Sequence, residues 1–131
     1  MVPAVVYDHP LMQEPAGTPP LDVAAAMRVV GGDKALLVEL GQIFLEELPV
    51  RLGELQAAVE SRDPERTRLA AHNLKGALAT LGATPARDLA YDLEQLGHTG
   101  GLATASGILA RLEEKLARVS DFLAAPGWVD G

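Results

Sequence analysis

The sequence contains no cysteine among its 131 residues, and aromatic residues make up only 4% of it. Disulfide bonds and thiolate metal sites are therefore excluded, which fits an intracellular protein. No apolar run is long enough to span a bilayer, and the first residues lack the basic and apolar regions of a secretory signal. We therefore expect a cytoplasmic protein that does not associate with membranes.

Basic residues are also few. The sequence has 11 Lys and Arg against 18 Asp and Glu, which gives a formal net charge of −7. This balance argues against nucleic acid as the main partner. The charge is uneven, since residues 62–88 hold five basic and three acidic side chains, a local charge of +2. The basic ones are Arg62, Arg66, Arg68, Lys75 and Arg87. This region favours an acidic partner surface or a phosphoryl group.

Apolar residues recur at spacings of three and four, which is the pattern of amphipathic helices. The segments are 21–30, 34–60, 64–81, 85–97 and 102–124. In the second of them the apolar positions are taken as Leu36, Leu40, Phe44, Leu48, Leu52, Leu55 and Val59. Pro49 lies inside this segment, and because the apolar stripe continues past it we expect a kink there rather than an end. No segment alternates with period two over enough residues to predict a strand.

Residues at the segment ends support these boundaries. Asp33, Asp63 and Thr84 are suited to cap the helices that follow them, and Pro64 and Pro85 suit first helical positions. Gly82 suits the position just past a helix end, and Gly97, Gly100 and Gly101 are expected to form a loop.

Four amphipathic helices joined by short turns must alternate in direction and bury their apolar stripes together. The sequence therefore predicts an all-α protein, an antiparallel four-helix bundle with a short additional N-terminal helix that covers one end. The bundle domain is placed at residues 21–125. Residues 1–20 hold five of the nine prolines and are expected to be a flexible lead-in, and 126–131 form a C-terminal tail. Whether Trp128 packs back on the bundle is left open.

The helix over 64–81 carries the most informative histidine. On a helical wheel, Ala70, Leu74, Ala77 and Leu81 form the core-facing stripe, and His72 falls roughly opposite them. The residues expected around it on the outer face are Glu65, Arg68, Lys75, Gly76 and Ala79. His72 is therefore predicted to stand in water with a cation one turn away.

Gly76 strengthens this interpretation, since a glycine inside a helix costs about 1 kcal/mol relative to alanine. It points away from the core stripe, so it clears space beside His72 rather than allowing helices to pack closely. Lys75 is near enough to place its ammonium beside a negative group carried by His72.

Other chemistry fits the sequence less well. A hydrolytic triad needs a histidine oriented by a third group, whereas His72 is predicted to be in water. A phosphate-binding glycine loop is absent from the sequence. Glu94 and His98 are one helical turn apart and could share a metal, but no further set of inward glutamates accompanies them. We expect those two to form a solvated pair near a helix end.

The sequence HNLKG at residues 72–76, with Gly82 six residues on, resembles the signature of histidine-containing phosphotransfer (HPt) domains. Upstream, Gly31-Gly32-Asp33 and the segment 44–49, which ends in Pro49, resemble the long helix of that family. Downstream, residues 90–97 resemble its next helix, and the similarity covers roughly residues 21–123.

The resemblance implies a phosphoryl carrier of a two-component phosphorelay, without kinase activity of its own. His72 would accept a phosphoryl group from a receiver-domain aspartate and pass it to another, and Lys75 would offset the phosphoryl charge. Gly76 and Ala79 would give the receiver clearance, with Arg68 and Arg87 at the rim of the docking surface. Mg²⁺ would come from the receiver, and the family resemblance favours a monomer.

The partners implied are response-regulator receiver domains or a hybrid histidine kinase. Two alternatives stay open: a helical module that docks a receiver without carrying phosphate, and a bundle with a metal or small-ligand site.

Overall fold

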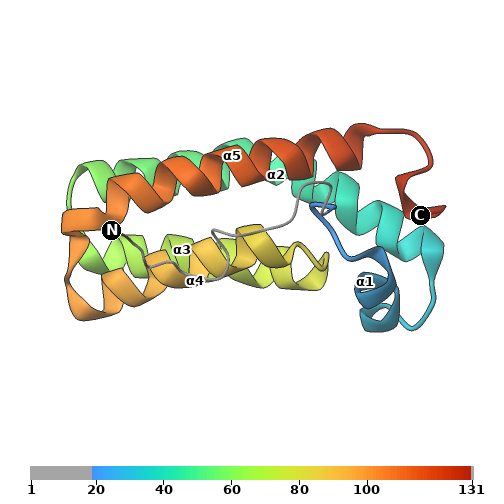
Figure 1. Cartoon of the computed structure of the whole chain (residues 1–131), viewed down its shortest axis with the longest axis horizontal. Coiled ribbons are helices and arrows are strands. Elements are labelled where there is room, and N and C mark those ends of the chain that lie inside the picture. The colour runs from blue at the N-terminus through green and yellow to red at the C-terminus, as the bar shows by residue number, and fades with distance from the viewer. Residues whose placement is uncertain (1–18, 131) are drawn as a thin grey trace, which may run out of the picture.

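The computed structural model describes residues 19–130, and all the regular elements within these residues are helices (Figure 1). The elements in chain order are α1 (Val23–Val29), α2 (Lys34–Glu60), α3 (Pro64–Thr80), α4 (Thr84–Thr99), the short 3₁₀ helix η2 (Leu102–Thr104), α5 (Ala105–Ala124) and η3 (Trp128–Asp130). The helices α2 to α5 form the predicted antiparallel bundle, and α1 lies against the end where α2 extends beyond its neighbours (Figure 1). None of the helices over residues 19–130 has the length and apolar character needed to cross a membrane.

Capping side chains set two of the helix starts as predicted. The carboxylate of Asp33 accepts a hydrogen bond from the backbone N–H of Leu36 at 3.0 Å, and that of Asp63 accepts one from Arg66 at 3.1 Å. The prediction for Thr84 is wrong, because α4 begins one residue earlier. Ala83 occupies the N-cap position without a side-chain bond, and its carbonyl accepts from the N–H of Arg87 at 2.8 Å.

The long helix α2 runs unbroken through Pro49, so the apolar stripe outweighs the lost backbone hydrogen bond. Its predicted stripe needs correction at the start, where Leu37 is fully buried and Leu36 is 39% exposed. Leu40 and Leu52 are half-buried on the flanks of the stripe.

The core stripe of α3 is rotated slightly from the predicted one. Thr67, Ala71, Leu74 and Leu78 are the fully buried residues within this helix, whereas Ala70 and Ala77 are half-buried. The wheel weighted alanines as core residues, but the larger Leu78 takes the central position, as burial of more apolar area favours. His72 stays on the outer face after this rotation.

A further correction concerns Gly97, which lies inside α4 and is buried rather than in a loop. A Cβ atom at this position would lie 2.6 Å from the backbone N of Arg68 and 2.7 Å from the carbonyl oxygen of Pro64. The missing side chain therefore lets α4 lie directly against the first turns of α3. Gly100 and Gly101 follow α4, and Gly100 ends it in the left-handed conformation with φ of 80°.

Both ends of the described chain pack on the bundle. Leu21 is buried, and the N–H of Asp22 donates to the carbonyl of Gly82 at 2.8 Å, which fixes the chain beside the α3–α4 turn. Trp128 packs back on the bundle, 6.1 Å from Phe122 between ring centroids and over Gly41. The predicted flexible lead-in of residues 1–20 lies outside the described residues except for Pro19 and Pro20.

Candidate functional site

His72 stands on the outer face of α3 with 57% of its side chain exposed. It lies two turns beyond the start of the helix, which Asp63 caps and Pro64 begins. These two residues therefore determine where His72 lies along the bundle axis. The helix that carries it, α3, has α4 and α2 as its neighbours in the bundle (Figure 1). The imidazole is thus accessible to another molecule.

Glu94 of α4 holds this imidazole from the side, a role that the sequence analysis missed. Its Oε2 lies 2.9 Å from Nδ1 of His72, and its Oε1 lies 2.7 Å from Nζ of Lys75. Because an ionised carboxylate only accepts hydrogen bonds, Nδ1 carries the proton and Nε2 keeps its lone pair on the outward side. The predicted pairing of Glu94 with His98 is therefore wrong.

The environment of Glu94 keeps it ionised. Its side chain is only 14% exposed, and burial raises the pKa of its carboxyl group. The ion pair with Lys75 and the hydrogen bond from His72 act in the opposite direction and outweigh burial, so the pKa of Glu94 lies below its usual value of 4.5. The carboxylate is therefore charged at neutral pH and available to both partners.

Lys75 lines a cavity between α3 and α4, on the α4 side of His72. Its Nζ lies 5.3 Å from the ring centroid of Tyr91, which is within the range of a cation–π contact. The cavity has a volume of about 420 Å³ and is lined by Lys75, Gly76, Ala79, Arg87, Asp88 and Tyr91. Four residues predicted as functional thus share one concave surface, and Tyr91, which is 48% exposed, is an addition to them.

Gly76 leaves open space one turn after His72. A Cβ atom at this position would meet nothing within 4 Å, so no packing within the described protein requires a glycine here. Glycine at this exposed position makes the helix less stable than alanine would. The open space agrees with the predicted clearance beside His72, and its use by another molecule stays a prediction.

Apolar surface lies on the other side of His72, between α2 and α3. A shallow groove of about 140 Å³ includes Leu40, Ile43, Phe44, Ala77 and Leu81, and Ile43 is 40% exposed. Val50 on α2 and Leu69 on α3 are also exposed, at 66% and 46%. Isolated exposed leucines need no explanation, but apolar side chains on adjacent helices around an accessible histidine suit a protein interface.

The predicted basic rim is less positive than the sequence suggests. Arg68 pairs with Glu65 at 2.7 Å, and Arg87 pairs with Asp88 at 2.6 Å. Their charge is thus largely compensated within the protein, and a counted local charge of +2 overstates the field that a partner would meet. Within residues 19–130, no three of the His, Asp and Glu residues are grouped so that they could hold a metal ion.

An antiparallel four-helix bundle that presents an exposed histidine on one helix, oriented by a carboxylate from the next, defines a histidine phosphotransfer module. The chain belongs to this family, because the model of the Hpt domain matches residues 39–122.

A solved structure supports the fold. The chain is similar to the crystal structure of histidine-containing phosphotransfer protein B (HptB) from Pseudomonas aeruginosa PAO1, with a TM-score of 0.74 and 24% sequence identity. The similarity covers 82% of this chain and 93% of that protein. No curated protein matches the sequence.

Glu94 can be identified as the partner of His72 only when it is known which helices face each other. Its position on the wheel places it beside the stripe of Leu89, Ala90 and Leu93. That wheel does not say whether the flank faces α3 or α5, because the answer depends on the order of helices around the bundle. The separation of 22 residues between Glu94 and His72 carries meaning only once α3 and α4 are placed side by side.

Proposed function

We propose that the protein carries a phosphoryl group on His72 between the aspartates of receiver domains in a two-component phosphorelay. The observation that carries this proposal is the pairing of Nδ1 of the exposed His72 with the buried carboxylate of Glu94. This arrangement leaves one defined nucleophilic nitrogen facing outward, in a chain of the Hpt family.

The chemical step is an in-line displacement. The lone pair on Nε2 of His72 attacks the phosphorus of an aspartyl phosphate, and the bond between phosphorus and the aspartate oxygen breaks. The electron pair of that bond leaves with the carboxylate, and the phosphorylated imidazolium keeps the proton on Nδ1. Glu94 stabilises this cation by its negative charge and by the hydrogen bond from Nδ1. The reverse reaction delivers the phosphoryl group to the next aspartate.

Lys75 and Gly76 contribute charge and space. Phosphoryl transfer depends mainly on alignment and on neutralisation of the oxygens. Lys75 is held by Glu94 and Tyr91 within one turn of His72, where its ammonium can turn toward a phosphoryl oxygen. Gly76 and Ala79 leave room for receiver loops. We expect Mg²⁺ and its acidic ligands to come with the receiver, and we ascribe no ATP-dependent activity to this chain.

The receiver is proposed to dock around His72, on the cavity of Lys75 and Tyr91 and on the apolar residues between α2 and α3. Arg68 and Arg87 lie at the edge of this surface and are expected to affect the rate of association more than the chemical step. Both sides of His72 are thereby used, which would fix the orientation of the bound receiver.

The test is transfer of labelled phosphate from a phosphorylated receiver domain to the wild-type protein and to His72→Gln. We expect label on the wild type alone, lost in acid and stable in base. A folded wild type that accepts no label from any of several receivers, yet binds them, would contradict the carrier role and favour a docking module. Label on His72→Gln would place the acceptor elsewhere.

A further inference from the structure

The outer flank of α2 carries a row of apolar side chains that continues the groove between α2 and α3. Leu36, Ile43 and Val50 follow one another at spacings of seven residues, so they lie nearly on one line along the helix. All three are exposed, and Ile43 also lines the groove with Ala77 and Leu81 of α3. The row is therefore the outer border of the apolar surface that α2 shares with α3.

The antiparallel packing of α2 and α3 brings this row to the phosphotransfer site. Ile43 and Thr80 line the same groove. Seven residues forward along α2 correspond to seven residues back along α3, so Val50 lies at about the level of His72. Leu36 lies on the part of α2 that extends beyond its neighbours (Figure 1). A partner that reaches His72 from this side therefore covers Val50 and Ile43.

Acidic side chains border the apolar row. Glu39 and Glu46 lie on one side of it and Glu47 and Glu54 on the other, each within about 60° around the helix. Glu47 pairs with Arg51 at 2.9 Å. Glu39, Glu46 and Glu54 are exposed, and they form no ion pair with another of the residues 19–130. Their negative charges are therefore available to a partner.

The charge on the two sides of His72 differs as a result. Helix α2 holds five glutamates against two basic residues, so its formal charge is −3. On the α4 side of His72, the cations Arg68, Lys75 and Arg87 are each paired with a carboxylate. The surface over α2 is therefore acidic, whereas the charge on the α4 side is compensated within the protein.

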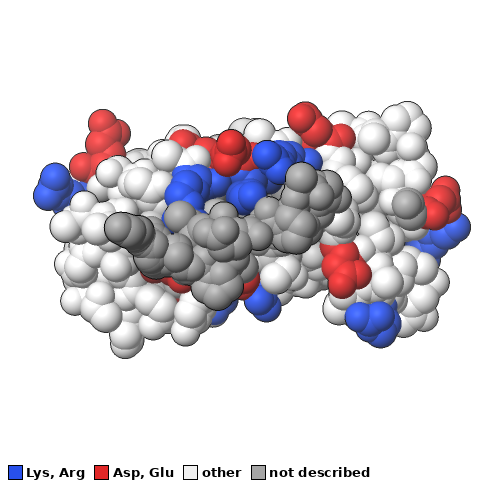
Figure 2. Space-filling view, viewed as in Figure 1, with Lys and Arg blue, Asp and Glu red and all other residues white. Residues whose placement is uncertain are grey.

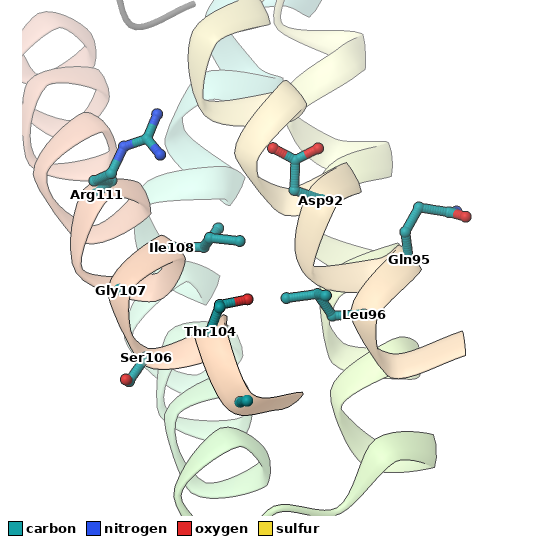
Figure 3. Close-up of a pocket in the computed structure, with 9 residues that line it drawn as sticks. Asp92, Gln95, Leu96, Thr104, Ser106, Gly107, Ile108 and Arg111 are labelled. Carbon is teal, nitrogen blue, oxygen red and sulfur yellow. The ribbon is translucent and has the colours of Figure 1, made fainter. Parts of the chain in front are cut away.

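The opposite face of the bundle, between α4 and α5, is separate from this surface. It holds a groove of about 830 Å³ across which Leu96 and Ile108 point toward one another, with Asp92 and Arg111 at one end (Figure 3). Figure 2 shows Lys and Arg side chains gathered over α5 on this face of the molecule. A partner bound on α2 and α3 leaves this face uncovered, so substitutions there can serve as controls.

The chemistry of the α2 surface indicates what covers it. A second copy of the chain is disfavoured, because it carries the same carboxylates and the same net charge of −7. A partner with apolar residues bordered by Lys or Arg is complementary. Because the surface is continuous with the site of His72, this inference rests on the proposed function. We propose that the receiver docks with a basic edge over α2, and that Glu46 and Glu54 select such receivers and orient them.

The test measures binding of unphosphorylated receiver domains to the full chain by calorimetry, at low and at high salt. The variant with both Glu46→Gln and Glu54→Gln is compared with a variant that carries Glu114→Gln and Asp121→Asn. The second variant removes the same charge from exposed positions on α5. For receivers that bind the wild type, we expect the α2 variant to weaken binding about fivefold at low salt and the α5 variant less than about twofold. The effect of the α2 variant should shrink at high salt.

The outcomes separate this inference from the carrier role. Equal affinities of the two variants, or a weakening that high salt does not reduce, would overturn the inference even if phosphate is transferred to His72. Binding that depends on Glu46 and Glu54 without transfer from the phosphorylated receiver would support the inference and contradict the carrier role. Failure of every receiver to bind would overturn both. A dimer of the protein alone that Val50→Gln dissociates would overturn the inference, because the occupant would be a second copy.

Discussion

His72 owes its chemical definition to one residue on another helix. An exposed imidazole on a free helix can adopt either of two tautomers, and neither nitrogen is directed toward a partner. The carboxylate of Glu94, 2.9 Å from Nδ1, removes that choice and leaves Nε2 unprotonated, as the proposed function requires of a nucleophile. Glu94 is thus a positioning residue, and it ties the orientation of His72 to that of Lys75.

The pH dependence of stability should report on Glu94. Its pKa is lowered in the folded protein, so the unfolded chain binds the proton more tightly. The stabilising contribution is therefore complete above pH 4.5, the usual value, and is lost as the pH falls through the lower folded pKa. We expect Glu94→Gln to be about 1–2 kcal/mol less stable than the wild type at pH 7.

The difference in the free energy of unfolding between the wild type and Glu94→Gln should shrink toward pH 3. Urea unfolding at a series of pH values measures it. Lys75→Met removes the cation whose ion pair lowers the pKa of Glu94, so it should flatten the dependence of wild-type stability on pH in the same way. Parallel curves for the wild type and Glu94→Gln would show that this carboxylate is not coupled to its neighbours.

Gly76 allows a prediction in which stability and activity move in opposite directions. Gly76→Gln introduces a better helix former into open space, so the protein should gain about 0.5–1 kcal/mol of stability. Its side chain would occupy the clearance beside His72, and transfer from a phosphorylated receiver should fall by at least about tenfold, equivalent to about 1.4 kcal/mol in the barrier.

Gly107→Gln is the control for this experiment, since it makes the same change on α5 away from His72 and should transfer normally. Normal transfer by Gly76→Gln would mean that the glycine gives no clearance to the receiver.

Helix α4 is the element on which both surfaces of the molecule depend. One flank supplies Glu94 and Tyr91 to the phosphotransfer site, and the other supplies Asp92 and Leu96 to the groove with α5. Its distance from α3 is set at Gly97, where the two backbones nearly touch. The reach of Glu94 to His72 therefore depends on a residue that takes no part in the chemistry.

Gly97→Ala tests this dependence. The added methyl group would lie under 3 Å from backbone atoms of Arg68 and Pro64, which cannot move aside as a flexible side chain would. We expect a loss of about 1–3 kcal/mol in the free energy of unfolding, although alanine favours a helix.

Gly107→Ala, in open space, should be neutral or stabilising. Urea unfolding of the two variants gives the comparison, and equal stabilities would show that the helices are not in close contact at Gly97.

Over the whole molecule, the sequence predicted the arrangement of helices because the stripes of leucine, the caps and the glycines agree with one another. The exposure of His72, its relation to Lys75 and the open space at Gly76 all follow from the periodicity of one helix. Glu94 and Gly97 could not be placed in this way, because their roles depend on which helix faces which. The predicted positive charge of the rim was too high for a related reason. A count of net charge does not show that Arg68 and Arg87 each form an ion pair with a neighbouring carboxylate.

The whole molecule exposes His72 on one side. The central claim of the proposed function concerns which atom accepts the phosphoryl group. The most direct measurement is an NMR spectrum of the ¹⁵N-labelled imidazole of His72 after reaction with a phosphorylated receiver. The Glu94 hydrogen bond predicts coupling of phosphorus to Nε2 and a retained proton on Nδ1. Phosphorus bonded to Nδ1, or an unmodified His72 in a protein that has accepted phosphate, would contradict the account.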